Sequence, residues 1–167
     1  MHSGPVILNN TPLVAFWVLN RLDLLQSMYY KIYIPKAVFE EFIAIDETVR
    51  RQSLARSPWI EVLPLQAPAY ALTFVGLDAG EAEVLALALE RSARLVIMDE
   101  RKGRTYAQRL SLPLTGTVGV LLAAKSRGFI NAVSPMIDTL LKNDFYLNAA
   151  LIHRVLQTAG EASHNQG

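Results

Sequence analysis

The chain has 167 residues and a net charge of +1 at pH 7, with 51% hydrophobic and 19% charged residues. This length fits one domain with a sizeable core, and so apolar a composition excludes a largely disordered chain. Cysteine is absent, which excludes disulfides, thiolate nucleophiles and cysteine-ligated metal centres. Because the net charge is close to zero, a polyanion would have to bind a local basic patch.

No apolar run reaches the roughly 18 residues of a membrane span, and the N-terminus lacks a signal-peptide pattern. We therefore expect a cytoplasmic protein that does not contact a membrane. We also expect a single domain over residues 1–160, followed by a flexible C-terminal tail over residues 161–167.

The first elements alternate between strand and helix. Val6–Leu8 is a short apolar run, and Thr11 is suited to cap a helix after it. Apolar residues then recur at helical spacing over residues 13–28. A second apolar run, Ile32–Ile34, precedes Pro35 and predicts another strand that enters another helix.

The middle of the chain continues this alternation. The polar stretch 46–58 is consistent with a helix end or with a mobile lid, and residues 60–65 with a short strand. Residues 79–91 have a strong helical pattern, and residues 95–98 form the continuous apolar run of a strand buried on both faces.

The last third predicts an edge strand at residues 113–114 and four helices, at residues 101–110, 117–127, 135–142 and 148–158. Because parallel neighbours need a crossover connection that is usually helical, the alternation predicts an α/β fold with a mainly parallel sheet.

Polar residues that follow buried strands are the first candidates for a functional site, because ligands of parallel sheets bind beyond the carboxyl ends of the strands. Asn9 and Asp99 both occupy such positions. Asp99 could equally serve as the N-cap of the helix that follows.

Two glutamates lie on helix faces that otherwise point to the core. Glu81 shares its stripe with apolar residues three, four, seven and eight positions later, and Glu41 lies beside the stripe formed by Val38 and Phe42. A carboxylate on an apolar stripe is costly unless it is paired, hydrogen-bonded or metal-bound. The simpler alternatives are an interaction of Glu81 with the helix dipole and an ordinary surface position for Glu41.

Glu41, Glu81 and Asp99 come from distant segments, and we expect them to converge beside Asn9 at one edge of the sheet. Such a group of carboxylates suits Mg²⁺ or Mn²⁺, and without a cation its members would repel one another.

Seven stretches, taken in order, resemble the PIN-domain family of metal-dependent ribonucleases, close to the toxins called VapC. The closest likeness is to an uncharacterised branch with asparagine in place of the first acidic residue. The stretches are residues 9–13, 21–25, 34–41, 77–83, 99–104, 116–121 and 144–147.

The resemblance implies a three-layer α/β/α fold of the PIN type, which is Rossmann-like, and hydrolysis of RNA phosphodiester bonds. It carries the catalytic positions over to Asn9, Glu41, Glu81 and Asp99. Mg²⁺ or Mn²⁺ would be bound by Asp99 and Glu81 together with Glu41, while Glu41 and Asn9 would also position water.

The same resemblance suggests how RNA would be contacted. Thr11 would orient Asn9, and Arg101, Lys102 and Arg104 would contact phosphate. A solvated helix face explains those three basic residues equally well. Family members commonly pair with a small antitoxin and form homodimers, so both partners are expectations for this chain.

Asn9 leaves the enzymatic activity open. PIN nucleases usually have aspartate there, and removal of one negative charge should weaken cation binding. The alternative function is a catalytically weak or inactive PIN-like module that binds RNA or a protein partner. A Rossmann-like domain that binds a small molecule would instead have a concave apolar pocket.

Overall fold

The computed structural model describes residues 3–161 and contains a five-stranded sheet in the order β3-β2-β1-β4-β5. All four strand pairings are parallel. The strands are β1 (Val6–Leu8), β2 (Ile32–Ile34), β3 (Ile60–Val62), β4 (Leu95–Ile97) and β5 (Leu114–Thr115). The prediction of an α/β fold with a mainly parallel sheet is confirmed.

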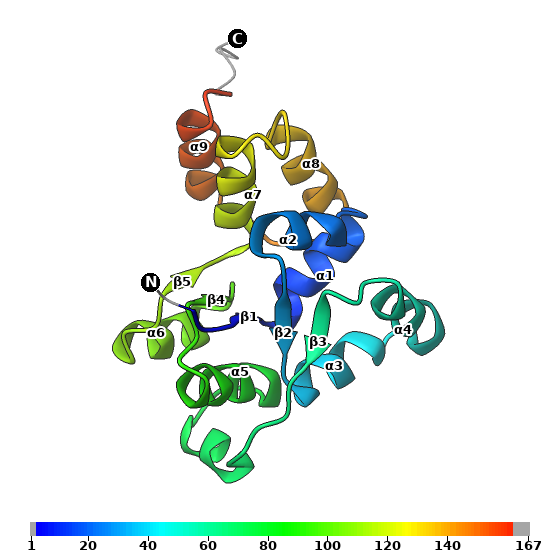
Figure 1. Ribbon diagram of the computed structural model, residues 1–167. Coiled ribbons are helices and arrows are strands. Elements are labelled where there is room, and N and C mark those ends of the chain that lie inside the picture. Colours follow the sequence, from blue (N-terminus) through cyan, green and yellow to red (C-terminus); the bar gives the residue numbers. More distant parts are fainter. Residues whose placement is uncertain (1–2, 162–167) are drawn as a thin grey trace.

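Helices cover both faces of the sheet, which gives the predicted three-layer α/β/α arrangement (Figure 1). In that view α1, α2, α7, α8 and α9 lie above the strands, and α3 and α5 lie below them. The helices are α1 (Asn10–Val18), α2 (Leu22–Tyr29), α3 (Lys36–Ile43), α4 (Glu47–Ala55), η1 (Pro68–Thr73), α5 (Ala79–Glu90), α6 (Arg101–Arg109), α7 (Thr117–Ser126), α8 (Ser134–Lys142) and α9 (Ala149–Thr158).

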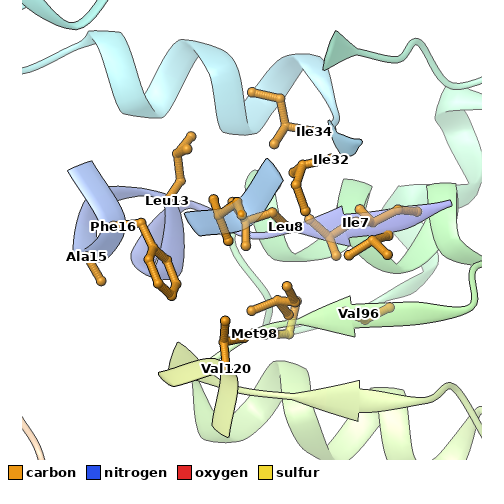
Figure 2. Packing of buried hydrophobic residues seen from close by; sticks show 14 of the residues in the cluster. Ile7, Leu8, Leu13, Ala15, Phe16, Ile32, Ile34, Val96, Met98 and Val120 are labelled. Carbon is orange, nitrogen blue, oxygen red and sulfur yellow. The ribbon is translucent and has the colours of Figure 1, made fainter. Parts of the chain in front are cut away.

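The core is formed where the short central strands meet the helices. Ile7, Leu8 and Val96 of β1 and β4 are fully buried, and Leu13 and Phe16 of α1 pack beside them (Figure 2). Strands of only two or three residues depend on this packing, since they form few ladder hydrogen bonds of their own.

The continuous helical spacing over residues 13–28 belongs to two helices, so the expectation of one helix was wrong. Asn20 has a φ of 54°, in the left-handed region that asparagine tolerates, and it ends α1 before Arg21 leads into α2. Both helices bury a face against the same core, which is why the apolar spacing continues across the break.

Two further expectations are resolved by the helix boundaries. Asn9 is the N-cap position of α1 and Thr11 lies inside the helix, so the assignment of Thr11 as a cap was wrong. The polar stretch 46–58 contains α4, whose Arg50 side chain is only 6% exposed. The stretch is therefore a mostly exposed helix that is anchored by one buried side chain.

The C-terminal end of the described chain is held by Glu161, which we placed in the flexible tail. Its carboxylate accepts hydrogen bonds from Lys125 Nζ at 2.8 Å and from the backbone N–H groups of Val133 and Ser134. The rest of the expected tail, residues 162–167, lies outside the described residues. Among residues 3–161 no helix has the length and apolar character that crossing a membrane requires.

Candidate functional site

The candidate site lies at the carboxyl ends of β1 and β4, which are neighbours at the centre of the sheet. From β1 the chain adds β2 and β3 on one side, and it then returns to add β4 and β5 on the other. This reversal makes the β1/β4 edge the position at which parallel sheets usually bind ligands. The backbone N–H of Asn9 donates to the carbonyl of Ile97 at 2.9 Å, so the two strand ends are joined directly.

Asn9 is 3% exposed, and its side chain contacts Glu100, the second acidic residue after β4. Asn9 Nδ2 donates to Glu100 Oε2 at 3.2 Å, and the Thr11 hydroxyl donates to the other oxygen of the same carboxylate. Asn9 Oδ1 is buried and accepts no hydrogen bond from the residues that the structure describes. A buried acceptor without a partner is costly, so this oxygen is available to a ligand or to water.

Glu41 reaches the first turn of α5 from helix α3. Its Oε1 accepts a hydrogen bond from the backbone N–H of Gly80 at 2.9 Å. A Cβ atom at residue 80 would lie 2.6 Å from that oxygen, so the close approach requires glycine. Helices α3 and α5 pack against each other, which brings Glu41 beside Glu81.

Glu81 is 7% exposed and closes a capping box with Asp78. The Glu81 backbone N–H donates to Asp78 Oδ1 at 2.8 Å, and Glu81 Oε2 accepts from the Asp78 N–H at 3.3 Å. The core-facing position predicted for Glu81 is thus confirmed. Its placement in the first turn of α5 also fits the alternative role at the helix terminus.

The electrostatics join these glutamates into one cluster. Burial raises the pKa of both Glu41 and Glu81, and the negative charges of Asp78 and Glu100 raise it further. Glu81 is also raised by the charge of Glu41. We call Glu41, Glu81, Glu100 and Asn9 the acidic pocket. A bound cation would relieve the repulsion among its three carboxylates.

Asp99 points to helix α7. Its Oδ1 accepts from the Thr117 backbone N–H at 2.8 Å, and its Oδ2 accepts from the Thr117 hydroxyl at 2.5 Å. A Cβ atom at Gly116 would lie 2.6 Å from Asp99 Oδ1 and 3.2 Å from Arg104 Nη1, so these two side chains flank Gly116. The N-cap position of α6 is Glu100 rather than Asp99.

The three basic residues of α6 differ in their contacts. Arg104 Nη1 donates to the carbonyl of Met98 at 2.8 Å, and this bond fixes it against the end of β4. Arg101 and Lys102 are exposed, and neither forms an ion pair with a residue in the range 3–161. Both are therefore free to contact an anion.

The donors of the acidic pocket suit a hard divalent cation in kind, since they are carboxylate oxygens and one unpaired amide oxygen. The positions of these donors, however, do not form a metal site in this structure. Over the described range, no three acidic or histidine side chains stand close enough together to hold a metal ion. Metal binding therefore requires side chains to move closer together, and the carboxylates of Glu41, Glu81 and Asp99 are held in their present positions by backbone N–H groups.

Sequence reasoning missed Glu100. It follows Asp99 directly, and the contacts with Asn9 and Thr11 belong to Glu100. The available signal was the pair of acidic residues after β4, from which only the first was selected.

The family comparison agrees with the fold. A family model described as a PIN domain matches residues 5–161, which include all five strands and the whole acidic pocket. Among curated proteins, no match to the chain was found.

Proposed function

This chain belongs to the PIN-domain family, whose fold is generally that of a nuclease, and from that premise we propose that it is a metal-dependent ribonuclease. It would hydrolyse RNA phosphodiester bonds at the carboxyl edge of β1 and β4. The finer assignment to a VapC-like toxin is part of the same proposal.

The observation that carries the proposal is the acidic pocket with its unpaired oxygen. The pKa values of Glu41 and Glu81 are raised, in part by the charge of Glu100. Glu100 in turn accepts a hydrogen bond from Asn9, whose Oδ1 is buried without a partner among the described residues. Perturbed carboxylates at the ligand-binding edge of a parallel sheet are typical of catalytic sites. The backbone N–H groups of Gly80 and Asp78 offset only part of the repulsion, because both pKa values remain raised.

We assign Glu81 and Glu41 of the acidic pocket as residues that would hold Mg²⁺ or Mn²⁺, together with Asp99, which lies outside the pocket in this structure and would have to turn away from Thr117. When bound, such an ion activates water and neutralises charge on a phosphoryl group. Asn9 Oδ1 would orient the attacking water, and Glu100 would fix the Asn9 amide through its bond to Nδ2. The raised pKa of Glu41 makes its ionised carboxylate a stronger base towards that water than an ordinary glutamate.

The substrate phosphates would be bound by helix α6. Arg101 and Lys102 are exposed near the site and are the stronger candidates, while Arg104 would act through its position beside Asp99. Neutralisation of each phosphate contact should lower RNA affinity in a manner that depends on salt.

The alternative is a catalytically weak or inactive PIN-like module that binds RNA or a protein partner. Asn9 favours it, because the amide supplies no negative charge and its Nδ2 donates to a carboxylate that an aspartate would repel. Cation affinity should be lower with this residue than with aspartate.

Cleavage of a structured RNA in Mn²⁺ separates the two functions. The variants are Asp99→Asn, Glu81→Gln and Asn9→Asp, with Glu40→Gln as the control, because Glu40 is an exposed neighbour of Glu41 that pairs with Lys36. The nuclease predicts cleavage by the native chain, a loss of at least about 100-fold in Asp99→Asn and Glu81→Gln, and no loss in Glu40→Gln. Cleavage that appears only in Asn9→Asp would support the silent module.

The partners are proposed on the family relation. A small antitoxin and a homodimer would each need an apolar surface, and Leu72, Val75 and Leu141 are large exposed apolar side chains. Leu140, the neighbour of Leu141 in α8, is fully buried in the core and is not part of such a surface. Light scattering measures the oligomeric state. A toxin would arrest the growth of cells that express this chain, and co-expression of the protein encoded by a neighbouring gene would relieve the arrest.

A further inference from the structure

A second feature lies at the opposite ends of the strands. A cavity of about 560 Å³ opens where the chain enters β1, β2 and β4. Its lining also includes Tyr33, within β2, and Leu63, which follows β3. Ser3, Gly4 and Pro5 form one wall. The acidic pocket stands at the carboxyl ends of the same strands. The cavity is therefore separate from the proposed nuclease site, and its size is that of a small-molecule site.

The lining combines cations with aromatic rings. Lys31, Arg91 and Arg94 supply positive charge, Tyr29, Tyr30 and Tyr33 supply rings, and no acidic residue is among the described residues that line the cavity. Lys31 pairs with Glu61 outside the lining at 3.2 Å. Neither Arg91 nor Arg94 forms an ion pair in the range 3–161.

Arg91 has an unmet hydrogen-bonding group. Its Nε is buried and finds no acceptor among the described residues. Arg94 is held in place by the bond from its Nη2 to the Tyr29 carbonyl at 3.2 Å, which leaves its other N–H groups available. The Nε–H of Arg91 is closed to solvent, so a phosphate in the cavity would reach Arg91 through its terminal N–H groups, and arginine suits phosphate well because its planar fork donates two hydrogen bonds.

Tyr30 is held in an unusual conformation at the rim. Its φ is 70° and its ψ is −53°, and the Lys31 N–H donates to the Tyr29 carbonyl at 2.8 Å across it, which closes a three-residue turn. This turn is rare and strained for a residue with a large side chain. Its ring is 80% exposed, so core packing does not explain why a tyrosine stands where glycine would be unstrained.

We propose that this cavity binds a phosphorylated nucleoside, either free or as one nucleotide of an RNA strand. Arg91 and Arg94 hold the phosphate, and the base stacks on the exposed ring of Tyr30. Aromatic stacking beside basic groups is the usual chemistry of single-stranded nucleic-acid binding, and it needs no sequence-specific contact. The proposal stands whether or not the acidic pocket is a nuclease.

Calorimetric titration of the full chain tests the proposed nucleotide binding. EDTA is present throughout, because it prevents metal-dependent cleavage of the probes. The probes are uridine 5′-monophosphate, uridine and inorganic phosphate. We expect the nucleotide to bind at least tenfold more tightly than either of the other two, since both halves of the ligand are recognised. A tetrauridylate that binds at least tenfold more tightly than the mononucleotide identifies an RNA strand as the source, and equal affinity identifies the free nucleotide.

Two variants and one control complete the experiment. Arg94→Gln should weaken binding about tenfold, while Arg109→Gln, which removes the same charge from the exposed end of α6, should leave it within twofold. Tyr30→Gly should also weaken binding about tenfold and raise the melting temperature, because it removes the ring together with the strain. Full affinity in both variants, or equal binding of nucleotide and phosphate, would overturn the nucleotide assignment. Glu81→Gln should bind normally, which separates this result from a failure of the nuclease.

Discussion

At the scale of single residues, Glu81 performs two tasks that conflict. Its side chain completes the capping box of α5, which stabilises the helix, and it also adds a buried negative charge beside Glu41 and Glu100. The capping box needs only a hydrogen-bond acceptor at the end of this side chain, and glutamine could supply one. The charge is therefore the component that points to function.

This conflict predicts that Glu81→Gln stabilises the fold at pH 7 by roughly 0.5–2 kcal/mol. Because burial and neighbouring carboxylates raise the pKa of Glu81 in the folded state, its stabilising contribution is present below the ordinary glutamate pKa and lost as pH rises through the raised value. The difference in the free energy of unfolding between Glu81→Gln and the native chain should therefore shrink as the pH falls towards 4. Urea unfolding at both pH values measures it, with the exposed Glu40→Gln as control. A difference that widens in acid would show that the pKa is not raised.

At the scale of elements, one buried cation joins three helices. The Arg50 guanidinium of α4 lies 4.6 Å from the ring centre of Trp17 in α1 and 4.9 Å from that of Phe42 in α3. Its Nη1 donates to the Phe42 carbonyl at 2.9 Å, and burial lowers its pKa. The polar helix α4 has few apolar residues to bury, so this contact replaces the usual apolar stripe.

We therefore expect Arg50→Ala to lower the free energy of unfolding by roughly 2–4 kcal/mol, because it removes packing and a buried hydrogen bond together. Arg50→Lys should recover only part of the loss, since an ammonium group lacks the planar fork that stacks on both rings. Arg51→Ala on the exposed face of the same helix should cost at most about 1 kcal/mol. Chemical denaturation compares the three, and equal losses for Arg50 and Arg51 would contradict the assignment.

The junction of α3 and α5 gives another prediction, at Gly80. Alanine is normally better than glycine in a helix by up to about 1 kcal/mol. Here its methyl group would lie 2.6 Å from Glu41 Oε1, so the Glu41 carboxylate must move and lose the Gly80 N–H. Gly80→Ala should leave stability nearly unchanged in the native chain but raise it in a Glu41→Ala background. A double-mutant cycle by thermal denaturation measures this coupling. If the effects of the two substitutions on stability simply add, the contact between Glu41 and residue 80 is excluded.

The order of strands and helices was predictable because the spacing of apolar residues reports directly which side chains are buried. Continuous apolar runs marked the buried strands, and apolar residues at helical spacing marked the helices. The break at Asn20 was hidden, since α1 and α2 bury the same side and keep one spacing across the turn. Glu81 was found for the same reason as the helices, from its place on an apolar stripe. The orientation of Asp99 was not predictable, because it depends on Thr117, which lies 18 residues away in the sequence.

At the scale of the whole molecule, the two ends of the strands differ in their local charge. The carboxyl edge combines the carboxylates of the acidic pocket with the basic residues of α6, whereas the cavity at the amino edge is lined by Lys31, Arg91 and Arg94 and by no acidic residue among those described. A net charge of +1 for the whole chain does not report this difference. Local fields, rather than the total charge, therefore decide which ligands each edge attracts.

Cation binding at the acidic edge should be visible without any substrate. Mn²⁺ that binds only the folded chain stabilises it by about 2.7 kcal/mol at 100 times its dissociation constant. For a chain of this size that corresponds to a rise in melting temperature of roughly 5–10 °C. Potassium chloride at equal ionic strength should have little effect, since screening alone does not replace coordination.

The pH dependence makes this test specific. Protons compete with the metal for Glu41 and Glu81, and because both pKa values are raised, the competition begins at a higher pH than for ordinary glutamates. The thermal shift should therefore decline as the pH is lowered from neutral, become larger in Asn9→Asp and nearly vanish in Glu81→Gln. A shift that persists in Glu81→Gln would show that Mn²⁺ binds elsewhere, and the metal assignment of the acidic pocket would then fail.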